Sequence, residues 1–124
     1  LSIYDSSMTS KWLSKALRHK IEQRDQMQCC YCGKHCERYN QRSNNYDYAT
    51  LDHIVPRIEL FKVSQDYDTF LKLLKDVTLL VVVCNACNSS KQHKTLFEWA
   101  MEKGLNYPVL LAEITRRISI PLYT

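Results

Sequence analysis

The sequence lacks any apolar run long enough to cross a lipid bilayer. Its longest apolar stretch, Val77 to Cys84, is interrupted by Thr78 and is far shorter than the roughly 20 residues of a membrane-spanning helix. The N-terminus also lacks the basic start, apolar run and small-residue cleavage site of a secretion signal. With only 2 glycines and 3 prolines, the chain contains no recognisable repeat, linker or low-complexity tract. We therefore expect no membrane-spanning segment in the sequence given, and one continuous folded unit.

A strong excess of charge of one sign is missing as well. Lys and Arg number 17 against 13 Asp and Glu, for a formal net charge of +4, which is compatible with a polyanionic partner without being evidence for one. Hydrophobic residues make up 45% and charged residues 24%, as in folded globular proteins and unlike disordered ones. We expect a single domain over residues 1–124.

Cysteine, by contrast, is abundant, with 6 residues in the chain. Cys29 and Cys32 form a first C-x-x-C hook, and Cys84 and Cys87 form a second hook. Two such hooks are typical of a structural Zn²⁺ ion that four thiolates hold tetrahedrally. The missing secretion signal favours a reducing, cytoplasmic compartment, and therefore zinc over disulfide bonds. We predict that this zinc stabilises the fold and takes no part in catalysis.

The other two cysteines are surplus to a four-thiolate site. Cys30 lies inside the first hook and is expected to point away from the ion, whereas Cys36 is either free or a competing ligand. His35 and Cys36 are the alternative ligands to the set of Cys29, Cys32, Cys84 and Cys87.

The spacing of apolar residues predicts a mixture of helices and strands. An amphipathic helix is expected at 10–27, with a basic face formed by Lys11, Lys15, Arg18 and Arg24. Further helices are expected at 70–74, 88–103 and 108–118, and strands at 48–55 and 77–83. Trp12, Phe97 and Trp99 are expected in the core, whereas Tyr39, Tyr46 and Tyr48 with Arg38 and Arg42 could stack on bases or pack on the domain.

Two segments combine residues that can carry chemistry. Asp52 and His53 are adjacent at a predicted strand end, where their side chains point in opposite directions. One can bind a metal ion while the other faces a water molecule or a substrate. Asn88, at the start of the following helix, can add its side-chain oxygen to the same ion. Carboxylate and amide oxygens suit Mg²⁺, which keeps other positions for waters and a substrate phosphate. This pattern predicts a phosphodiesterase.

Three motifs in a fixed order resemble the HNH endonuclease family. They are C-x-Y-C-G at 29–33, L-D-H-I-V-P-R at 51–57 and C-x-x-C-N-x-x-K at 84–91, and the resemblance covers about residues 10–103. It implies an α+β fold: a small, zinc-bound ββα-metal core within residues 29–103, flanked by the N-terminal helix at 10–27 and the C-terminal helix at 108–118.

The resemblance also implies the roles of individual residues. His53 would be the general base that activates water, and Asp52 with Asn88 would bind one divalent ion, Mg²⁺ or another. Arg57 and Lys91 would contact the nucleic-acid backbone, and we add His93 and Lys94 to this contact. The expected substrate is DNA, cut to leave 5′-phosphate and 3′-hydroxyl ends. A single site would nick one strand, and the protein could be a monomer or a homodimer.

One position departs from the family pattern. Leu79 stands where the family usually has an asparagine that braces the loop carrying the catalytic histidine. Thr78 or Asp76 could brace the loop instead, a bulge could shift the register, or the enzyme could be weakened. The alternative function is a zinc-bound nucleic-acid-binding module without catalysis, which the Asp-His pair disfavours. A thiol redox protein is disfavoured because two hooks on one ion leave no free dithiol.

Overall fold

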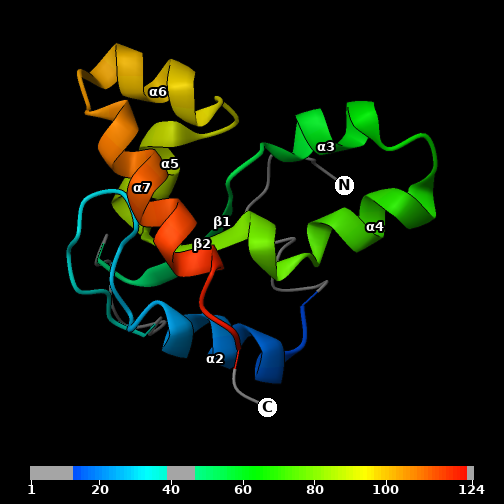
Figure 1. The fold of residues 1–124 in the computed structure, drawn as a ribbon, viewed down its shortest axis with the longest axis horizontal. Coiled ribbons are helices and arrows are strands. Elements are labelled where there is room, and N and C mark those ends of the chain that lie inside the picture. The colour runs from blue at the N-terminus through cyan, green and yellow to red at the C-terminus, as the bar shows by residue number, and fades with distance from the viewer. Residues whose placement is uncertain (1–12, 39–46, 123–124) are drawn as a thin grey trace.

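The computed structural model describes residues 13–38 and 47–122 and shows a small α+β fold. Along the chain its elements (Figure 1) are α2 (Lys15–Arg24), β1 (Ala49–His53), α3 (Arg57–Val63), α4 (Tyr67–Leu74), the 3₁₀ turn η1 (Val77–Leu79), β2 (Leu80–Cys84), α5 (Asn85–Lys91), α6 (Leu96–Lys103) and α7 (Tyr107–Ile118). Trp12, Tyr39, Arg42 and Tyr46 lie outside the described residues.

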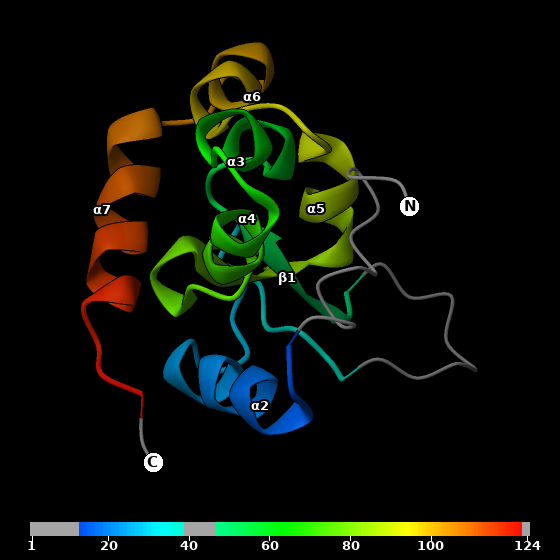
Figure 2. The same ribbon diagram turned by 90° about the vertical axis from the view of Figure 1, so that its right-hand side faces the viewer.

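A two-stranded antiparallel sheet forms the centre of the molecule. β1 pairs with β2 from Ala49↔Cys84 to His53↔Leu80. Every residue of β2 is buried, because helices cover both sides of the sheet. Figure 2 shows α2 on one side, α5 and α6 on the other, and α7 running alongside. This arrangement explains why β2 reads as a continuous apolar run instead of an alternating one.

The two strands are joined by a pair of helices that the sequence indicated only in part. α3 begins directly after Pro56, because proline fits the first turn of a helix, where its missing N–H costs no hydrogen bond. The sequence pattern gave no prediction for this segment. α4 corresponds to the short helix expected at 70–74. Leu60, Phe70 and Leu74 form a second, smaller core between α3 and α4, which project together to one side of the sheet (Figure 1).

The helix expected at 88–103 is two helices. α5 ends at Lys91, and Gln92 has a φ of 54°, which ends the helical hydrogen-bond ladder. α6 then begins after Thr95, which forms a capping box with Glu98: each side chain bonds to the other residue's backbone N–H. The chain therefore turns sharply after the second hook.

The basic face expected on the N-terminal helix is partly buried. Arg24 lies in the interior, where its guanidinium pairs with Asp25 at 2.7 Å and donates to the carbonyl of Leu80 at 2.6 Å. Arg117 is also buried and donates to the carbonyl of Gln28. These cations connect α2, β2 and α7 and are not available to a phosphate.

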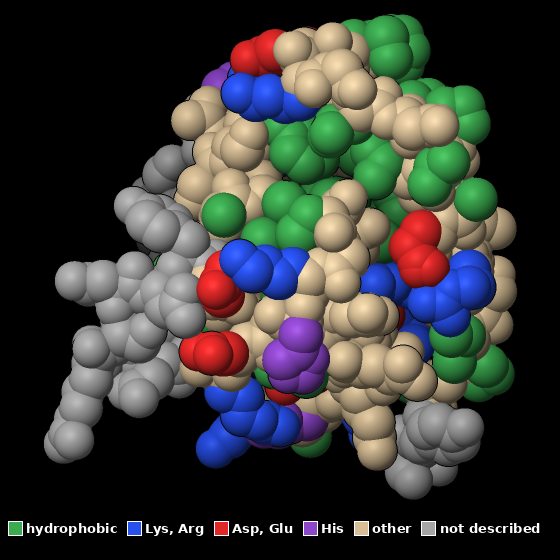
Figure 3. Space-filling model, turned by 90° about the vertical axis from the view of Figure 1, so that its left-hand side faces the viewer, with side chains coloured by type: hydrophobic (Ala, Val, Ile, Leu, Met, Phe, Trp, Pro, Cys, Tyr) green, Lys and Arg blue, Asp and Glu red, His purple; other side chains and the backbone are tan. Residues whose placement is uncertain are grey.

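One aromatic residue that was expected in the core lies at the surface. Trp99 is buried, as expected, whereas Phe97 is 53% exposed. Figure 3 shows hydrophobic side chains gathered on the upper part of the face that it presents. The large hydrophobic side chains that α6 and α7 expose are those of Phe97, Met101, Val109 and Leu111. None of the helices in the described part of the chain is long and apolar enough to span a membrane.

Candidate functional site

The two hooks meet in the structure and form a four-cysteine cluster. The sulfur atoms of Cys29, Cys32, Cys84 and Cys87 all lie within 4.8 Å of one another, and Sγ of Cys32 is 3.8 Å from Sγ of Cys84. A tetrahedral zinc ion with Zn–S bonds of about 2.3 Å requires S···S distances of about 3.8 Å. The cluster therefore has the size of one tetrahedral ion and is compatible with structural zinc.

Backbone hydrogen bonds set the shape of each hook. The amide of Cys32 donates to Sγ of Cys29, and the amide of Cys87 donates to Sγ of Cys84, both at 3.5 Å. Gly33 turns the first hook with a φ of 78°, which glycine adopts without steric cost. The amide of Cys30 donates to the carbonyl of Val82 at 2.8 Å, so the first hook is attached directly to β2.

The cysteine thiols differ in acidity. A hydrogen bond from Cys87, against the opposing effect of burial, lowers the pKa of Cys29 to about 5, while its role as a donor to Cys29 raises the pKa of Cys87. Burial raises the pKa of Cys30 and of Cys36 to about 12. The thiols of Cys30 and Cys36 therefore stay protonated at neutral pH, and a protonated thiol is a poor nucleophile.

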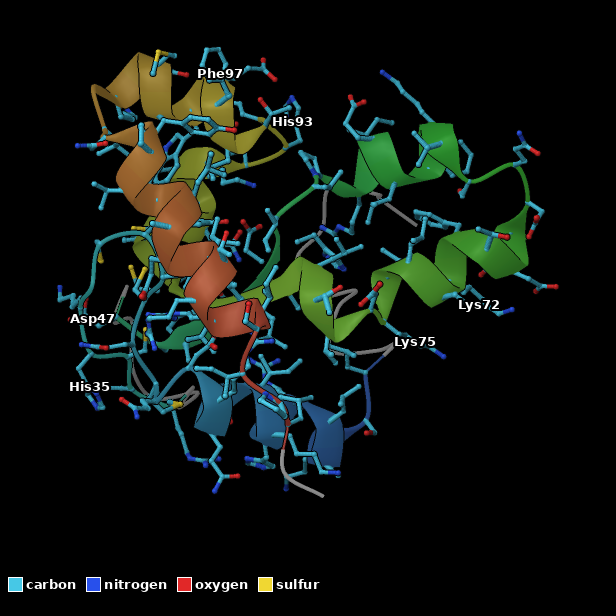
Figure 4. The ribbon with its side chains drawn as sticks, viewed as in Figure 1. His35, Asp47, Lys72, Lys75, His93 and Phe97 are labelled. Carbon is cyan, nitrogen blue, oxygen red and sulfur yellow. The ribbon has the colours of Figure 1, made fainter. Side chains whose placement is uncertain are left out.

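The alternative ligands lie outside the cluster. Neither Cys36, which is buried, nor His35, which is exposed on the first hook (Figure 4), joins the group of four sulfur atoms. Cys30 is also buried apart from it. The ligand set that the C-x-x-C spacing favoured is therefore the one that the fold brings together.

Asp52 is held from two sides on the face of β1 that contacts α5. Its Oδ2 atom accepts a hydrogen bond from the Tyr31 hydroxyl at 2.7 Å and lies 3.0 Å from Nζ of Lys91. Burial, followed by the nearby Asp52 carboxylate, raises the pKa of Tyr31, so its hydroxyl stays protonated and donates. Lys91 is fully buried and also donates to the carbonyl of His53 at 3.5 Å.

Asn88 reaches the same face of β1 from the first turns of α5. Its Nδ2 donates to Oγ1 of Thr50 at 2.9 Å, and Thr50 in turn donates to the carbonyl of Val83 at 2.9 Å. This chain of bonds fixes which end of the Asn88 amide is nitrogen. Within residues 13–38 and 47–122, the Oδ1 atom of Asn88 accepts no hydrogen bond, so it has its lone pairs available for a cation.

His53 points from the opposite face of β1 toward α4. Its Nε2 lies 3.0 Å from the carbonyl oxygen of Leu74. A carbonyl can only accept, so Nε2 carries the proton and Nδ1 has the free lone pair. Burial lowers the pKa of His53 below 6.5, and the charges of Arg57 and Lys91 act in the same direction. The imidazole is therefore neutral at pH 7, in the protonation state of a base.

Main-chain bonds hold the segment after His53. The amide of Ile54 donates to the carbonyl of Leu79 at 2.9 Å. The Asp76 carboxylate accepts hydrogen bonds from the amide and hydroxyl of Thr78, so both of its donors belong to η1. Leu79 therefore holds the segment after His53 through its backbone carbonyl, and Thr78 and Asp76 shape the turn that positions this carbonyl.

The four residues expected to contact nucleic acid occupy different environments. Arg57 begins α3 and is half-buried, while His93 is exposed between α5 and α6 (Figure 4). Lys94 pairs with Glu102 at 2.6 Å. Lys91 differs from the expectation, because its ammonium lies inside the protein beside Asp52 instead of on the surface.

Sequence reasoning missed Tyr31 as a partner of Asp52. Its position between two cysteines of the cluster, in the motif C-x-Y-C-G, was the available signal. When the chain is compared with protein-family models, curated proteins and solved structures, none of them matches it. The function must therefore be inferred from the chemistry of the site itself.

Proposed function

We propose that the protein is a metal-dependent endonuclease of the HNH type that hydrolyses phosphodiester bonds of DNA and nicks one strand per site. One observation carries this proposal. Asn88 of α5 and Asp52 of β1 lie on the same face of the two-stranded sheet, and a neutral histidine is the next residue along the strand. The two oxygen ligands thus lie on one face of the strand, strand and helix unit, and the base is the next residue of β1, on the opposite face.

The metal ligands in this proposal are Asp52 and Asn88. Oδ1 of Asp52 takes no part in the bonds to Tyr31 and Lys91, which both involve Oδ2. A carboxylate oxygen and an amide oxygen are hard donors of the kind that Mg²⁺ binds, with its remaining positions left to water and phosphate. When bound, such an ion supplies positive charge that stabilises the departing oxygen.

The base in this proposal is His53. Its Nε2–H is held by the Leu74 carbonyl, so Nδ1 is the atom that would accept the proton of the attacking water. Burial keeps the imidazole neutral at the pH of the reaction. The charge of Arg57, which begins α3, acts on this imidazole, and positive charge there favours the approach of a phosphodiester.

The second candidate is a zinc-bound nucleic-acid-binding module without catalysis. One observation favours it: Lys91 is fully buried against Asp52, and His53 is only 4% exposed. These contacts are also those of a satisfied interior, in which the Asp-His pair would have a structural role.

Plasmid nicking separates the two candidates. We expect the zinc-loaded protein to convert supercoiled plasmid to the nicked circle when Mg²⁺ is added and not in its absence. His53→Ala should lower the rate by about 10²–10⁴-fold, the usual contribution of a general base. The matched control is His35→Ala, which removes an exposed imidazole on the first hook and should cut at the wild-type rate. Equal cleavage by wild type and His53→Ala would remove His53 from the mechanism, and no cleavage by the wild type would favour the binding module.

A further inference from the structure

Two donors from different parts of the chain converge on one oxygen of Asp52. The Tyr31 hydroxyl comes from the first hook and the Lys91 ammonium comes from the end of α5, and both contact Oδ2, at 2.7 Å and 3.0 Å. A carboxylate oxygen offers about two lone-pair sites, so Oδ2 is fully used. The side chain cannot rotate without breaking a buried, charge-assisted bond.

Tyr31 also ties this carboxylate to the four-cysteine cluster. It lies in sequence between Cys29 and Cys32, both of which belong to the cluster. Its ring packs on Trp99 with centroids 5.3 Å apart, and it is buried. A shift of the first hook would therefore move the hydroxyl that holds Asp52.

We propose that Tyr31, with Lys91 opposite it, is a positioning residue of the divalent-metal site: the two hold Oδ2 of Asp52 and leave Oδ1 as the ligand atom. Through Tyr31, the structural zinc cluster sets the position of the carboxylate that binds the second metal. This inference rests on the proposed function for the identity of the metal ligands. Groups that orient a metal ligand without touching the metal typically contribute about 10–100-fold to metal affinity or activity.

The test is a titration of the zinc-loaded full chain with Mn²⁺, for wild type and for Tyr31→Phe. Electron paramagnetic resonance of the free ion measures how much Mn²⁺ is bound. Tyr31→Phe keeps the ring against Trp99 and removes only the hydroxyl, so we expect Mn²⁺ to bind about 10–100-fold more weakly. The matched control is Tyr107→Phe, which removes a hydroxyl from α7, where the Tyr107 ring packs on Phe97, and should bind Mn²⁺ as the wild type does. Zinc content and the unfolding midpoint show whether each variant is folded.

Three further measurements make the test decisive. In plasmid nicking, Tyr31→Phe should need a higher Mg²⁺ concentration for half-maximal rate and recover most of its rate at saturating Mg²⁺, which a general loss of structure would not produce. In an Asp52→Asn background, adding Tyr31→Phe should change Mn²⁺ affinity no further. If Tyr31→Phe loses zinc, Lys91→Gln tests the same oxygen from the other side and should weaken Mn²⁺ binding similarly.

The outcomes for the inference and for the nuclease proposal are distinguishable. Equal Mn²⁺ affinity in wild type and a folded Tyr31→Phe would overturn the positioning role, whatever the nuclease assay gives. Mn²⁺ binding that depends on Tyr31, in a protein that cuts no plasmid, would support the positioning role and reject the nuclease. A wild type that binds no Mn²⁺ would reject both.

Discussion

At the scale of single residues, the site combines charged and neutral groups that are all removed from water. Lys91 is fully buried, and Asp52 and His53 are nearly so. A buried charge is tolerated when it is paired and hydrogen-bonded, and the contact between Lys91 and Asp52 meets this condition. His53 avoids the free-energy cost of a buried charge because its imidazole remains neutral.

The protonation of His53 predicts how stability depends on pH. Because burial lowers the pKa of His53 in the folded protein below 6.5, the unfolded chain binds a proton first as the pH falls below about 6.5. This group's contribution to the free energy of unfolding is therefore complete above that pH and is lost on acidification, by up to about 1.4 kcal/mol per pH unit. The measurement is urea unfolding at pH 7.5 and pH 5.5 for wild type and His53→Gln.

The variant separates His53 from the other groups that titrate in acid. Glutamine cannot titrate, and it retains an N–H group that can face the Leu74 carbonyl. We expect the loss of stability between the two pH values to be smaller in His53→Gln. An identical loss in both proteins would show that His53 is not the buried, neutral group described here. Because the pKa of His53 lies below 6.5, we expect the rate of plasmid nicking to fall only when the pH is lowered below 6.5.

At the scale of elements, the break between α5 and α6 sets the path of the chain after the second hook. α5 spans only seven residues, Asn85–Lys91, and carries Asn88 and Lys91 on the side that faces β1. The chain then leaves this side at Gln92, whose positive φ ends the helix. The uninterrupted helix expected from the sequence would not have included this turn, and the cap at Thr95 explains why α6 begins anew.

The capping box of α6 gives a prediction for this element. Thr95→Ala removes the hydroxyl that accepts from the Glu98 amide at 3.1 Å, and we expect a loss of about 1 kcal/mol in the free energy of unfolding. Thr115→Ala is the matched control, because the Thr115 hydroxyl donates to the carbonyl of Leu111 within an exposed part of α7. This change should stay within about 0.5 kcal/mol of wild type. Urea unfolding measures both, and equal effects would show that the cap contributes nothing.

At the scale of the whole molecule, the four-cysteine cluster joins parts of the chain that are far apart in sequence. The first hook contacts β2 through the Cys30 amide, and the second hook continues β2 into α5. A two-stranded sheet is marginally stable on its own, so an ion held by this cluster would contribute strongly to folding by closing a long loop. The buried pair of Arg24 and Asp25 adds a second connection, from α2 to β2.

Removal of one ligand tests this dependence. We expect wild type to hold one zinc ion per chain, and Cys84→Ala to lose the ion and its native circular dichroism. Cys36→Ala is the control, because Cys36 is buried outside the cluster and its replacement should leave zinc content unchanged. A Cys84→Ala protein that keeps its native spectrum in the presence of a chelator would show that the fold does not need the ion.

Local features of the fold were predictable from short stretches of the amino-acid sequence. The spacing of Cys29, Cys32, Cys84 and Cys87 was enough to select the four sulfur atoms that the fold brings together, because a C-x-x-C turn places both sulfurs on one side. The apolar run of β2 was an equally local signal. The roles of Asp52, His53 and Asn88 in catalysis stay predictions, which the nicking and Mn²⁺ experiments test.

The partner of each buried polar group, by contrast, depends on how elements that are distant in sequence pack together. Lys91 and Asp52 are 39 positions apart, and nothing along the chain shows that the ammonium points inward to the carboxylate. The same holds for Tyr31 on Asp52 and for the Leu74 carbonyl on His53. Such bonds form because desolvated polar groups must be satisfied by whatever the packing of distant elements brings within reach, and that packing is a property of the folded chain as a whole.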